Sequence, residues 1–329
     1  MLLKDILRRK TEFPVMLAPM AEVTDLPFRE ICCAHGCDFT YTEMISAKGL
    51  HFLNKKTCSL LLTSSFEEPC GVQLFGSDPE IIAEAAKRLS EECFDKFALI
   101  DLNMGCPVKK IVNNGEGSAL MKNPLLAAKI VELSVKSSRL PITVKFRKGF
   151  DDSHVNAVEF AHVLEESGVG AITVHPRTRE QMYSGNADWD ILAKVKARVK
   201  IPVIGNGDIF SGNDALNMIA QTGVDGIMIA RGAKGNPFIF DEVKAAILGI
   251  PFHKISDKEI LEEAKKHIRL HVKKKGEGAF IELRKHIAWY TKGMRNAAVL
   301  REKINSAGGS LEITEFLDWY ADMLDKGLA

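Results

Sequence analysis

The chain has 329 residues, with 44 Lys and Arg against 43 Asp and Glu, so a formal net charge of +1 gives no overall attraction to nucleic acid. The hydrophobic share of 46% and charged share of 26% are ordinary for a globular protein with one large core and a smaller one. Residues 1–14 lack the apolar run and cleavage site of a secretion signal, and no segment approaches the ~18 apolar residues of a membrane span. We therefore expect a cytoplasmic protein without a membrane segment.

The seven cysteines are scattered along a chain that is too long to need disulfide bonds, so we expect reduced thiols. Cys32, Cys33 and Cys37 lie close together, but no second Cys/His pair follows at metal-ligand spacing. The sequence therefore predicts no metal site.

Short β-rich runs alternate with helical patterns through the first three quarters of the chain. The runs span residues 15–20, 37–44, 70–75, 97–104, 141–147, 170–177, 201–208 and 224–231. Apolar strands separated by helices indicate parallel βα units. Eight such units predict an α/β fold of the (β/α)8 TIM-barrel type, with a doubly wound sheet as the alternative. Ser77 to Glu80, with Pro79 in the first turn, is typical of a capping box before one of the helices.

Beyond the barrel, the pattern changes to amphipathic helices without strands. Ser256 to Glu259 forms another capping box and predicts a helix to about Lys275, followed by further helical segments. We therefore expect a barrel domain at residues 1–250 and a helical bundle at residues 251–329.

Polar groups end nearly every predicted strand, where a TIM barrel places its active site. The strand ends carry Pro19 and Met20, Glu43, Gln73, Asn103, Lys145 and Arg147, His175 and Arg177, Asn206 to Asp208, and Arg231 with Gly232. A purely structural barrel would not need these groups, so the pattern favours an enzyme.

The last two strands end in the glycine-rich segments GNGDI (205–209) and ARGAKG (230–235). Such loops commonly grip a phosphate through backbone N–H groups, and Arg231 could add a charged contact. Glycines also occur in plain βα turns, but the pair at adjacent strand ends favours a phosphate site.

Gln73 and Lys145 suit a flat heterocycle with polar edges, such as a flavin ring. Without a family for guidance, Lys145 could also form a Schiff base, or pack with Arg147 as structural residues of the rim. His175 is interpreted as a donor to the ring or substrate, or as a satisfied structural histidine.

Cys106 follows the fourth strand in a loop bounded by glycine and proline, so it should project over the barrel mouth. A thiol there can donate a proton or, once ionised, act as a nucleophile. The alternative is an ordinary loop cysteine.

Several segments together carry a resemblance to a known family. They are LAPMAEVTDLPFR (17–29), TEMISAKGL (42–50), QLFGSDPE (73–80), LNMGCPVKKIVNNGEGSALMKNP (102–124), ITVKFRKG (142–149), TVHPRTREQMYSGNADW (173–189), PVIGNGDI (202–209) and GIMIARGAKGNPFIF (226–240). In this respect the sequence resembles the bacterial tRNA-dihydrouridine synthases, most closely their B-type subfamily. Pro176 departs from the glycine of many relatives, and AKGNPF differs in detail from the usual B-type wording.

The resemblance implies an FMN-dependent enzyme that reduces the C5=C6 bond of particular uridines in tRNA, usually with NADPH. It assigns Cys106 as the catalytic acid, and Asn103 and Arg177 to the substrate. The residues that it assigns to the flavin are Pro19, Met20, Gln73, Lys145, His175, Asn206, Gly207, Asp208, Ala230, Arg231 and Gly232.

For contact with tRNA, basic residues beside the catalytic loop and on the bundle are candidates. They are Lys109, Lys110, Arg177, Arg179, Lys273 to Lys275, Arg284, Lys285, Lys292 and Arg295, although many bundle charges could simply face solvent. Trp289 and Tyr290 are expected in the bundle core. We expect a monomer.

The rival functions are an FMN barrel acting on a free pyrimidine, such as a dihydropyrimidine or dihydroorotate dehydrogenase, and a non-catalytic RNA-binding protein.

Overall fold

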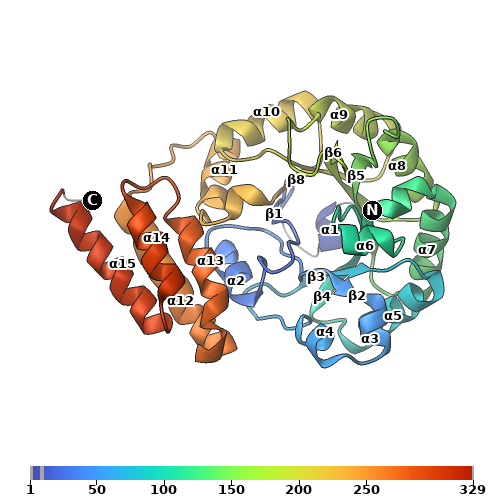
Figure 1. The fold of residues 1–329 in the computed structure, drawn as a ribbon. Helices are drawn as coiled ribbons and strands as arrows, with labels where there is room; N and C mark the ends of the chain where they lie inside the picture. Colours follow the sequence, from blue (N-terminus) through green and yellow to red (C-terminus); the bar gives the residue numbers. More distant parts are fainter. Residues whose placement is uncertain (1–2, 8–10, 328–329) are drawn as a thin grey trace.

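The structure is a computed structural model that describes residues 3–7 and 11–327. Eight parallel strands form one sheet in the order β1-β8-β7-β6-β5-β4-β3-β2, curled into a ring surrounded by helices (Figure 1). The strands are β1 (Val15–Leu17), β2 (Ile45–Ser46), β3 (Cys70–Phe75), β4 (Phe97–Met104), β5 (Ile142–Gly149), β6 (Ala171–Thr178), β7 (Val203–Asn206) and β8 (Gly226–Ile229). The predicted TIM-barrel class is confirmed.

Residues 38–42 complete the ring between β1 and β3. The Asp38 N–H donates to the Val15 carbonyl at 2.9 Å, and the Thr42 N–H donates to the Gly71 carbonyl at 2.9 Å. The segment forms the isolated bridges Met16↔Phe39 and Tyr41↔Gly71 in place of a continuous strand ladder. The second predicted strand, residues 37–44, therefore lies in the expected place but is too irregular to form a regular strand, which begins only at Ile45.

Helices follow the strands around the outside of the barrel. They are α2 (Leu26–Ala34), α3 (Ala47–His51), α4 (Lys55–Ser59), α5 (Pro79–Glu92), α6 (Lys109–Asn113), α7 (Pro124–Ser137), α8 (Ala157–Glu166), α9 (Trp189–Arg198), α10 (Gly212–Thr222) and α11 (Ile239–Leu248), with 3-10 turns η1 (Gly117–Lys122) and η2 (Arg231–Ala233). The cap of α5 is Asp78, whose carboxylate accepts the N–H groups of Glu80 and Ile81 at 3.1 Å. The N-cap residue is therefore Asp78 and not Ser77, so the capping box predicted at Ser77 is wrong. The helix begins at Pro79, as expected.

Two apolar layers hold the barrel together. Between strands and outer helices lies the larger layer, which includes Val72, Val144 and Phe160. Inside the barrel lies a smaller one, where Met16, Leu99 and other strand residues pack with Ile6 of α1 (Leu3–Leu7). Helix α1 thereby fills the end of the barrel opposite the strand C-termini, which leaves the C-terminal end for a site.

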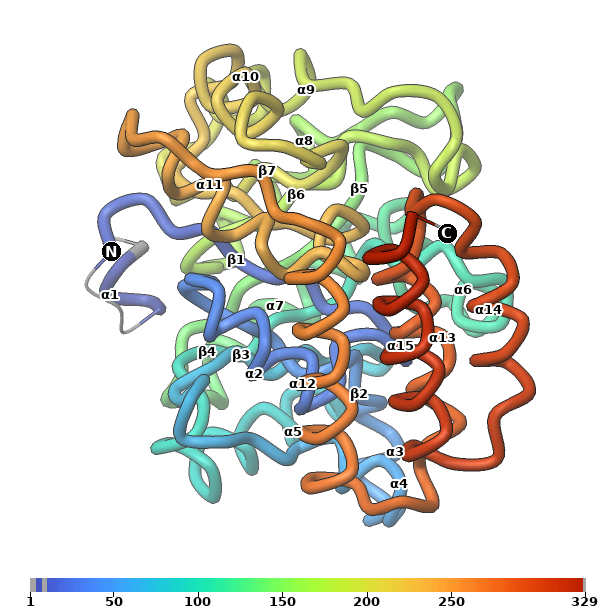
Figure 2. The backbone as a smooth tube through the Cα atoms, turned by 90° about the vertical axis from the view of Figure 1, so that its left-hand side faces the viewer, coloured from blue at the N-terminus to red at the C-terminus, as the bar shows by residue number. Residues whose placement is uncertain are grey.

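Four longer helices and a short turn make up the C-terminal part of the chain. They are α12 (Asp257–Lys275), η3 (Glu277–Ala279), α13 (Phe280–Tyr290), α14 (Ala297–Ser306) and α15 (Ser310–Asp325). The predicted capping box of α12 is confirmed, since Ser256 and Glu259 bond each other's backbone. The helices share their own apolar cluster, which includes Tyr290, whereas Trp289 is only half-buried. Figure 2 looks onto this bundle, which lies against the barrel beside α2 and α11.

Among the described residues, no helix combines the length and apolarity that crossing a bilayer requires.

Candidate active site

A cavity of about 660 Å³ opens at the C-terminal ends of the strands, a size that encloses a cofactor-sized ligand. It brings together side chains from six strand ends and the loops after them. The predicted site residues that line it are Pro19, Met20, Asn103, Cys106, Lys145, His175, Asn206, Gly207, Asp208, Ala230, Arg231 and Gly232.

Strand register explains why these groups converge. Asn103 on β4 pairs with Lys145 on β5, and Arg147 on β5 pairs with His175 on β6. Paired residues of neighbouring parallel strands share the same side of the sheet. The polar ends of β4, β5 and β6 therefore form one continuous wall of the cavity.

The loop that carries Cys106 is fixed by Asn103. The Asn103 Oδ1 atom accepts the N–H groups of Gly105 at 3.1 Å and Cys106 at 2.9 Å. On the other side, the Cys106 carbonyl accepts the Ser118 hydroxyl at 2.9 Å and the Ser118 N–H at 3.1 Å. The thiol-bearing residue is therefore held from both sides at the cavity edge.

Beneath this loop, a row of hydrogen bonds crosses three strands. The Asn103 amide donates to Gln73 Oε1 at 2.8 Å, and Gln73 Nε2 donates to Asp101 at 2.7 Å. Thr143 donates to the other Asp101 oxygen at 2.6 Å. Both ends of the Gln73 amide are thus engaged, and Gln73 is fully buried outside the cavity lining. In this structure Gln73 supports Asn103; its contact with a flavin ring stays a prediction.

Cations gather at the cavity wall. Burial and the neighbouring Arg147 lower the pKa of Lys145 to about 8, and its ammonium donates to Asn206 Oδ1 at 3.0 Å. The Arg147 guanidinium donates to the carbonyls of Gly105, Thr178 and Met182, each at 2.9 Å, so it ties the Cys106 loop to the loop after β6.

His175 lies among these cations and is buried. Burial, with Arg147 and Lys145 next in effect, holds its pKa well below the ordinary value. The imidazole is therefore neutral at physiological pH, with one nitrogen able to donate and the other able to accept a hydrogen bond.

The Cys106 thiol is protonated at neutral pH. Burial raises its pKa above the ordinary value of 9.0, although the Val108 N–H and the cations of Arg147 and Lys145 oppose the shift. A protonated thiol serves as a proton donor, whereas a nucleophilic cysteine requires a lowered pKa. The environment therefore favours the acid over the nucleophile.

Arg177 binds Asp208 instead of facing the cavity. Its guanidinium contacts both carboxylate oxygens, at 2.8 and 2.6 Å, and its side chain is 2% exposed. Arg231 reaches the same carboxylate at 2.9 Å. Burial opposes ionisation of Asp208, but these bonds and the Ala187 N–H outweigh it and lower the carboxyl pKa. Arg177 is thus a support for the loop after β7, and its predicted contact with substrate stays a prediction.

The basic residues proposed for RNA contact divide into two groups. Lys109 and Lys110 are exposed on α6, directly after the Cys106 loop, and Lys292 is exposed just after α13. By contrast, Lys274 pairs with Glu30 at 2.6 Å, and Lys275 pairs with the N-cap carboxylate of α2. Lys274 and Lys275 therefore hold the bundle to the barrel.

Comparisons with known proteins identify the family of this chain. The sequence profile of the dihydrouridine synthase (Dus) family matches residues 16–324. A probable tRNA-dihydrouridine synthase of Rickettsia conorii is 40% identical over 316 residues, which cover 94% of each chain. The tRNA-dihydrouridine synthase B of Pseudomonas aeruginosa is 37% identical over 293 residues, covering 88% of this chain and 87% of the relative. The chain belongs to the dihydrouridine synthase family.

This membership confirms the predicted resemblance and the predicted enzyme class, a flavin-dependent oxidoreductase of the Dus type. The synthase B of Shewanella oneidensis, 36% identical over 314 residues and covering 94% of this chain and 96% of that protein, agrees. A solved FabK structure from Thermotoga maritima, with a TM-score of 0.43 and 17% identity over 71% of this chain and 65% of that one, is too distant to add an argument. The fold assignment rests on the strand pairing of this Dus chain itself.

Sequence reasoning missed several residues of this Dus cavity. Tyr183 and Phe210 face the guanidinium of Arg231, with 4.8 and 5.6 Å between the guanidinium carbon and the ring centroids. Lys234 also lines the cavity and lies 3.9 Å from the Trp289 ring centre. Tyr183 and Lys234 lie within two segments that carry the family resemblance, 173–189 and 226–240, so their positions in these motifs could have indicated a place in the site. Phe210 follows GNGDI directly but is an ordinary apolar residue in the sequence.

Proposed function

We propose that this protein reduces the C5=C6 bond of uridines in tRNA, with bound FMN as hydride carrier, NADPH as reductant and the Cys106 thiol as the acid. The observation that carries the proposal is a cysteine fixed at the edge of a cofactor-sized cavity, where burial raises the pKa of its thiol. The names of the relatives, which are tRNA-dihydrouridine synthases, support tRNA as the substrate.

Support for a flavin mononucleotide comes from both ends of the cavity. At the phosphate end, a Cβ atom on Gly232 would lie 2.2 Å from the Ile209 carbonyl oxygen, so only glycine allows this close turn beside Arg231. Gly207 has φ +129°, a conformation that favours glycine. At the ring end, Lys145 offers a cation and His175 a neutral hydrogen-bonding group. These residues would hold the phosphate and the ring respectively.

When bound, the flavin supplies hydride to C6 of the uracil. The electron pair of the double bond then leaves negative charge on C5 and the C4 carbonyl oxygen. The Cys106 S–H transfers its proton to C5, which completes the reduction, and the thiolate regains a proton from solvent. Asn103 keeps Cys106 in place through the two N–H groups that it accepts. Because the thiol pKa is raised, the donor form is the resting form.

A folded RNA must release its base to reach this cavity, because the C5=C6 bond is shielded within a stack. We propose that the exposed Lys109 and Lys110 contact phosphates beside the cavity. Residues 251–329 would form the second contact surface, through exposed cations such as Lys273, Lys292 and Arg295. A tRNA substrate agrees with the predicted cytoplasmic location.

The test is single-turnover reoxidation. The purified protein is reduced with NADPH without oxygen and mixed with tRNA transcribed in vitro, which contains no dihydrouridine, while flavin absorbance is followed. The proposal predicts rapid reoxidation by tRNA and dihydrouridine in the digested product. Rapid reoxidation by free uridine or uracil, with no response to tRNA, would instead support a dehydrogenase acting on a free pyrimidine. Protein that binds tRNA but takes up no flavin would support the non-catalytic alternative.

A further inference from the structure

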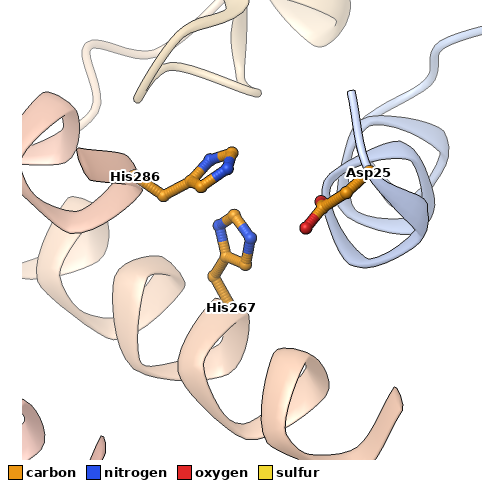
Figure 3. Close-up of side chains that lie close together, drawn as sticks. All are labelled: Asp25, His267 and His286. Atoms are coloured by element: carbon orange, nitrogen blue, oxygen red, sulfur yellow. The ribbon is translucent and has the colours of Figure 1, made fainter. Parts of the chain in front are cut away.

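The interface between barrel and bundle contains a buried polar cluster that the proposed reaction does not use. Asp25, the N-cap residue of α2, His267 on α12 and His286 on α13 have exposed fractions of 7%, 0% and 1%. Figure 3 shows the carboxylate and the two imidazoles turned toward one another from three different helices. We call this cluster the aspartate–histidine triad.

The donor atoms of the triad lie close enough to share one ion. One ligand atom from each residue lies within 4.8 Å of the other two. Zinc bonds of about 2.1 Å place tetrahedral ligand atoms about 3.4 Å apart, so the ligand atoms need to approach by at most ~1.4 Å. Two imidazoles with one carboxylate favour first-row transition ions over magnesium or calcium, which prefer oxygen ligands.

An unpartnered nitrogen points to a ligand. Among the described residues, His267 Nε2 is buried without a hydrogen-bond partner. The other ring nitrogen, Nδ1, lies 3.4 Å from the Tyr290 hydroxyl. Histidines that bind metals commonly engage their second nitrogen in this way. A buried nitrogen without a partner costs free energy, and a metal bond would remove that cost.

A neighbouring set of similar donors already holds a cation. Asp25, His271 and Glu282 also bring their ligand atoms together, but the ammonium of Lys275 contacts both carboxylates there. The same ammonium reaches the triad at one donor, Asp25 Oδ2, 3.2 Å away, and among the described residues it makes no hydrogen bond or ion pair with the two imidazoles. The Lys275 ammonium balances only part of the negative charge in this neighbouring set, because it faces two carboxylates, those of Asp25 and Glu282.

We propose that the aspartate–histidine triad binds one divalent transition-metal ion, with zinc as the best fit. Because α2 belongs to the barrel while α12 and α13 belong to the bundle, the ion joins the two parts of the molecule. This assignment departs from the sequence expectation of no metal site.

The test begins with the full-length, flavin-containing protein, dialysed against a chelator and titrated with ZnCl2 by calorimetry and with CoCl2 by visible spectroscopy. The proposal predicts one ion per chain and cobalt bands of tetrahedral intensity. It also predicts that zinc at about a hundredfold excess over Kd raises Tm by roughly 5 °C. No cobalt band and an unchanged Tm in this wild-type experiment would overturn the proposal without any variant.

Variants then locate the ion. His267→Gln and His286→Gln should each weaken zinc binding at least about tenfold, because one of three ligands is lost. His271→Gln, on the same helix beside Lys275, should retain binding, and so should His162→Gln, which disrupts the half-buried cluster of His162, Glu165 and Glu166. Loss of binding in either control, with retention in His286→Gln, would assign the ion elsewhere and overturn the proposal. Flavin content reports whether each variant is folded.

Discussion

The barrel mouth and the barrel–bundle interface are both rich in buried polar groups, but they are built differently. At the mouth, Asn103 and Ser118 pair the backbone of the Cys106 loop on both sides. At the interface, His267 retains an unpartnered nitrogen. The hydrogen bonds at the mouth hold the Cys106 thiol at the cavity. At the interface, one buried nitrogen of His267, among the described residues, has no hydrogen-bond partner and can bind a ligand. The comparison teaches that hydrogen bonds to the backbone of a loop can hold a reactive side chain at a cavity while that side chain remains available for chemistry.

The largest effect should come from removing that thiol. We predict that Cys106→Ala lowers tRNA reduction by ~10²- to 10⁴-fold, the usual contribution of a positioned acid. Flavin content and NADPH-driven flavin reduction should not change, because the proposed flavin contacts come from other residues of the cavity, such as Lys145 and Gly232. Single-turnover kinetics with nucleoside mass spectrometry measure both.

The matched control for this variant is Cys93→Ala, at the C-cap of α5 and away from the cavity. It should react as the wild type does. Equal product yields from the wild type and Cys106→Ala would remove Cys106 from the mechanism.

The next effect concerns the buried ion pair at the mouth. Arg177→Ala leaves the Asp208 carboxylate with only Arg231 as a cationic partner. We predict a loss of roughly 2 kcal/mol in the free energy of unfolding, which is less than the cost of breaking a fully buried pair because Arg231 still contacts Asp208. Flavin binding should weaken with it, because Asp208 lies beside Gly207. Thermal unfolding and flavin titration are the measurements.

Arg177→Lys keeps the charge but loses the two-pronged contact, so its effect should be intermediate. An unchanged Tm combined with weaker tRNA affinity in Arg177→Ala would instead support direct contact of Arg177 with the substrate.

A smaller effect is expected from the residues that hold the Cys106 loop. Asn103→Ala removes the acceptor of two loop N–H groups, so we predict a roughly 10- to 100-fold slower single turnover with flavin retained. Ser118→Ala should cost much less, because the Ser118 N–H still donates to the Cys106 carbonyl. The reverse order of the two rates would show that the η1 side, and not Asn103, positions the thiol.

The smallest effect should come from surface charge. Changing both Lys109 and Lys110 to Ala should weaken tRNA binding by about three- to tenfold and reduce its salt dependence, as expected for lost phosphate contacts. Lys136→Ala, an exposed lysine on α7, is the control. Filter binding at several salt concentrations measures the difference; an equal loss in the control would mean that only overall charge matters.

Sequence alone predicted the barrel and most of the mouth because their signals are local. Nearly every strand ends in its own polar residue, and the Cys106 loop is bounded by its own glycine and proline. The role of Asp101 was missed, although it stands in the same strand as Asn103, because its bonds to Gln73 and Thr143 depend on the register of three strands.

The interface could not be predicted in the same way. Lys274 and Lys275 follow a basic pattern typical of RNA contact, but they pair with acidic residues of α2 that are distant in the sequence. Asp25 and His286 come from opposite ends of the chain, so only the packing of the bundle on the barrel brings them together. Metal-ligand spacing within a short segment gives no signal for such a site.

The central claim is that the protonated Cys106 thiol is the acid, and its pH dependence tests this most directly. The measurement is the single-turnover rate of the wild type divided by that of Cys106→Ala across the neutral to alkaline range. Lys145, whose pKa is about 8, is present in both and affects both alike. Because the thiol pKa is raised, the ratio should stay level to the ordinary value of 9.0 and fall only above it. A ratio that rises with pH as the thiolate forms would contradict the account and make Cys106 a nucleophile.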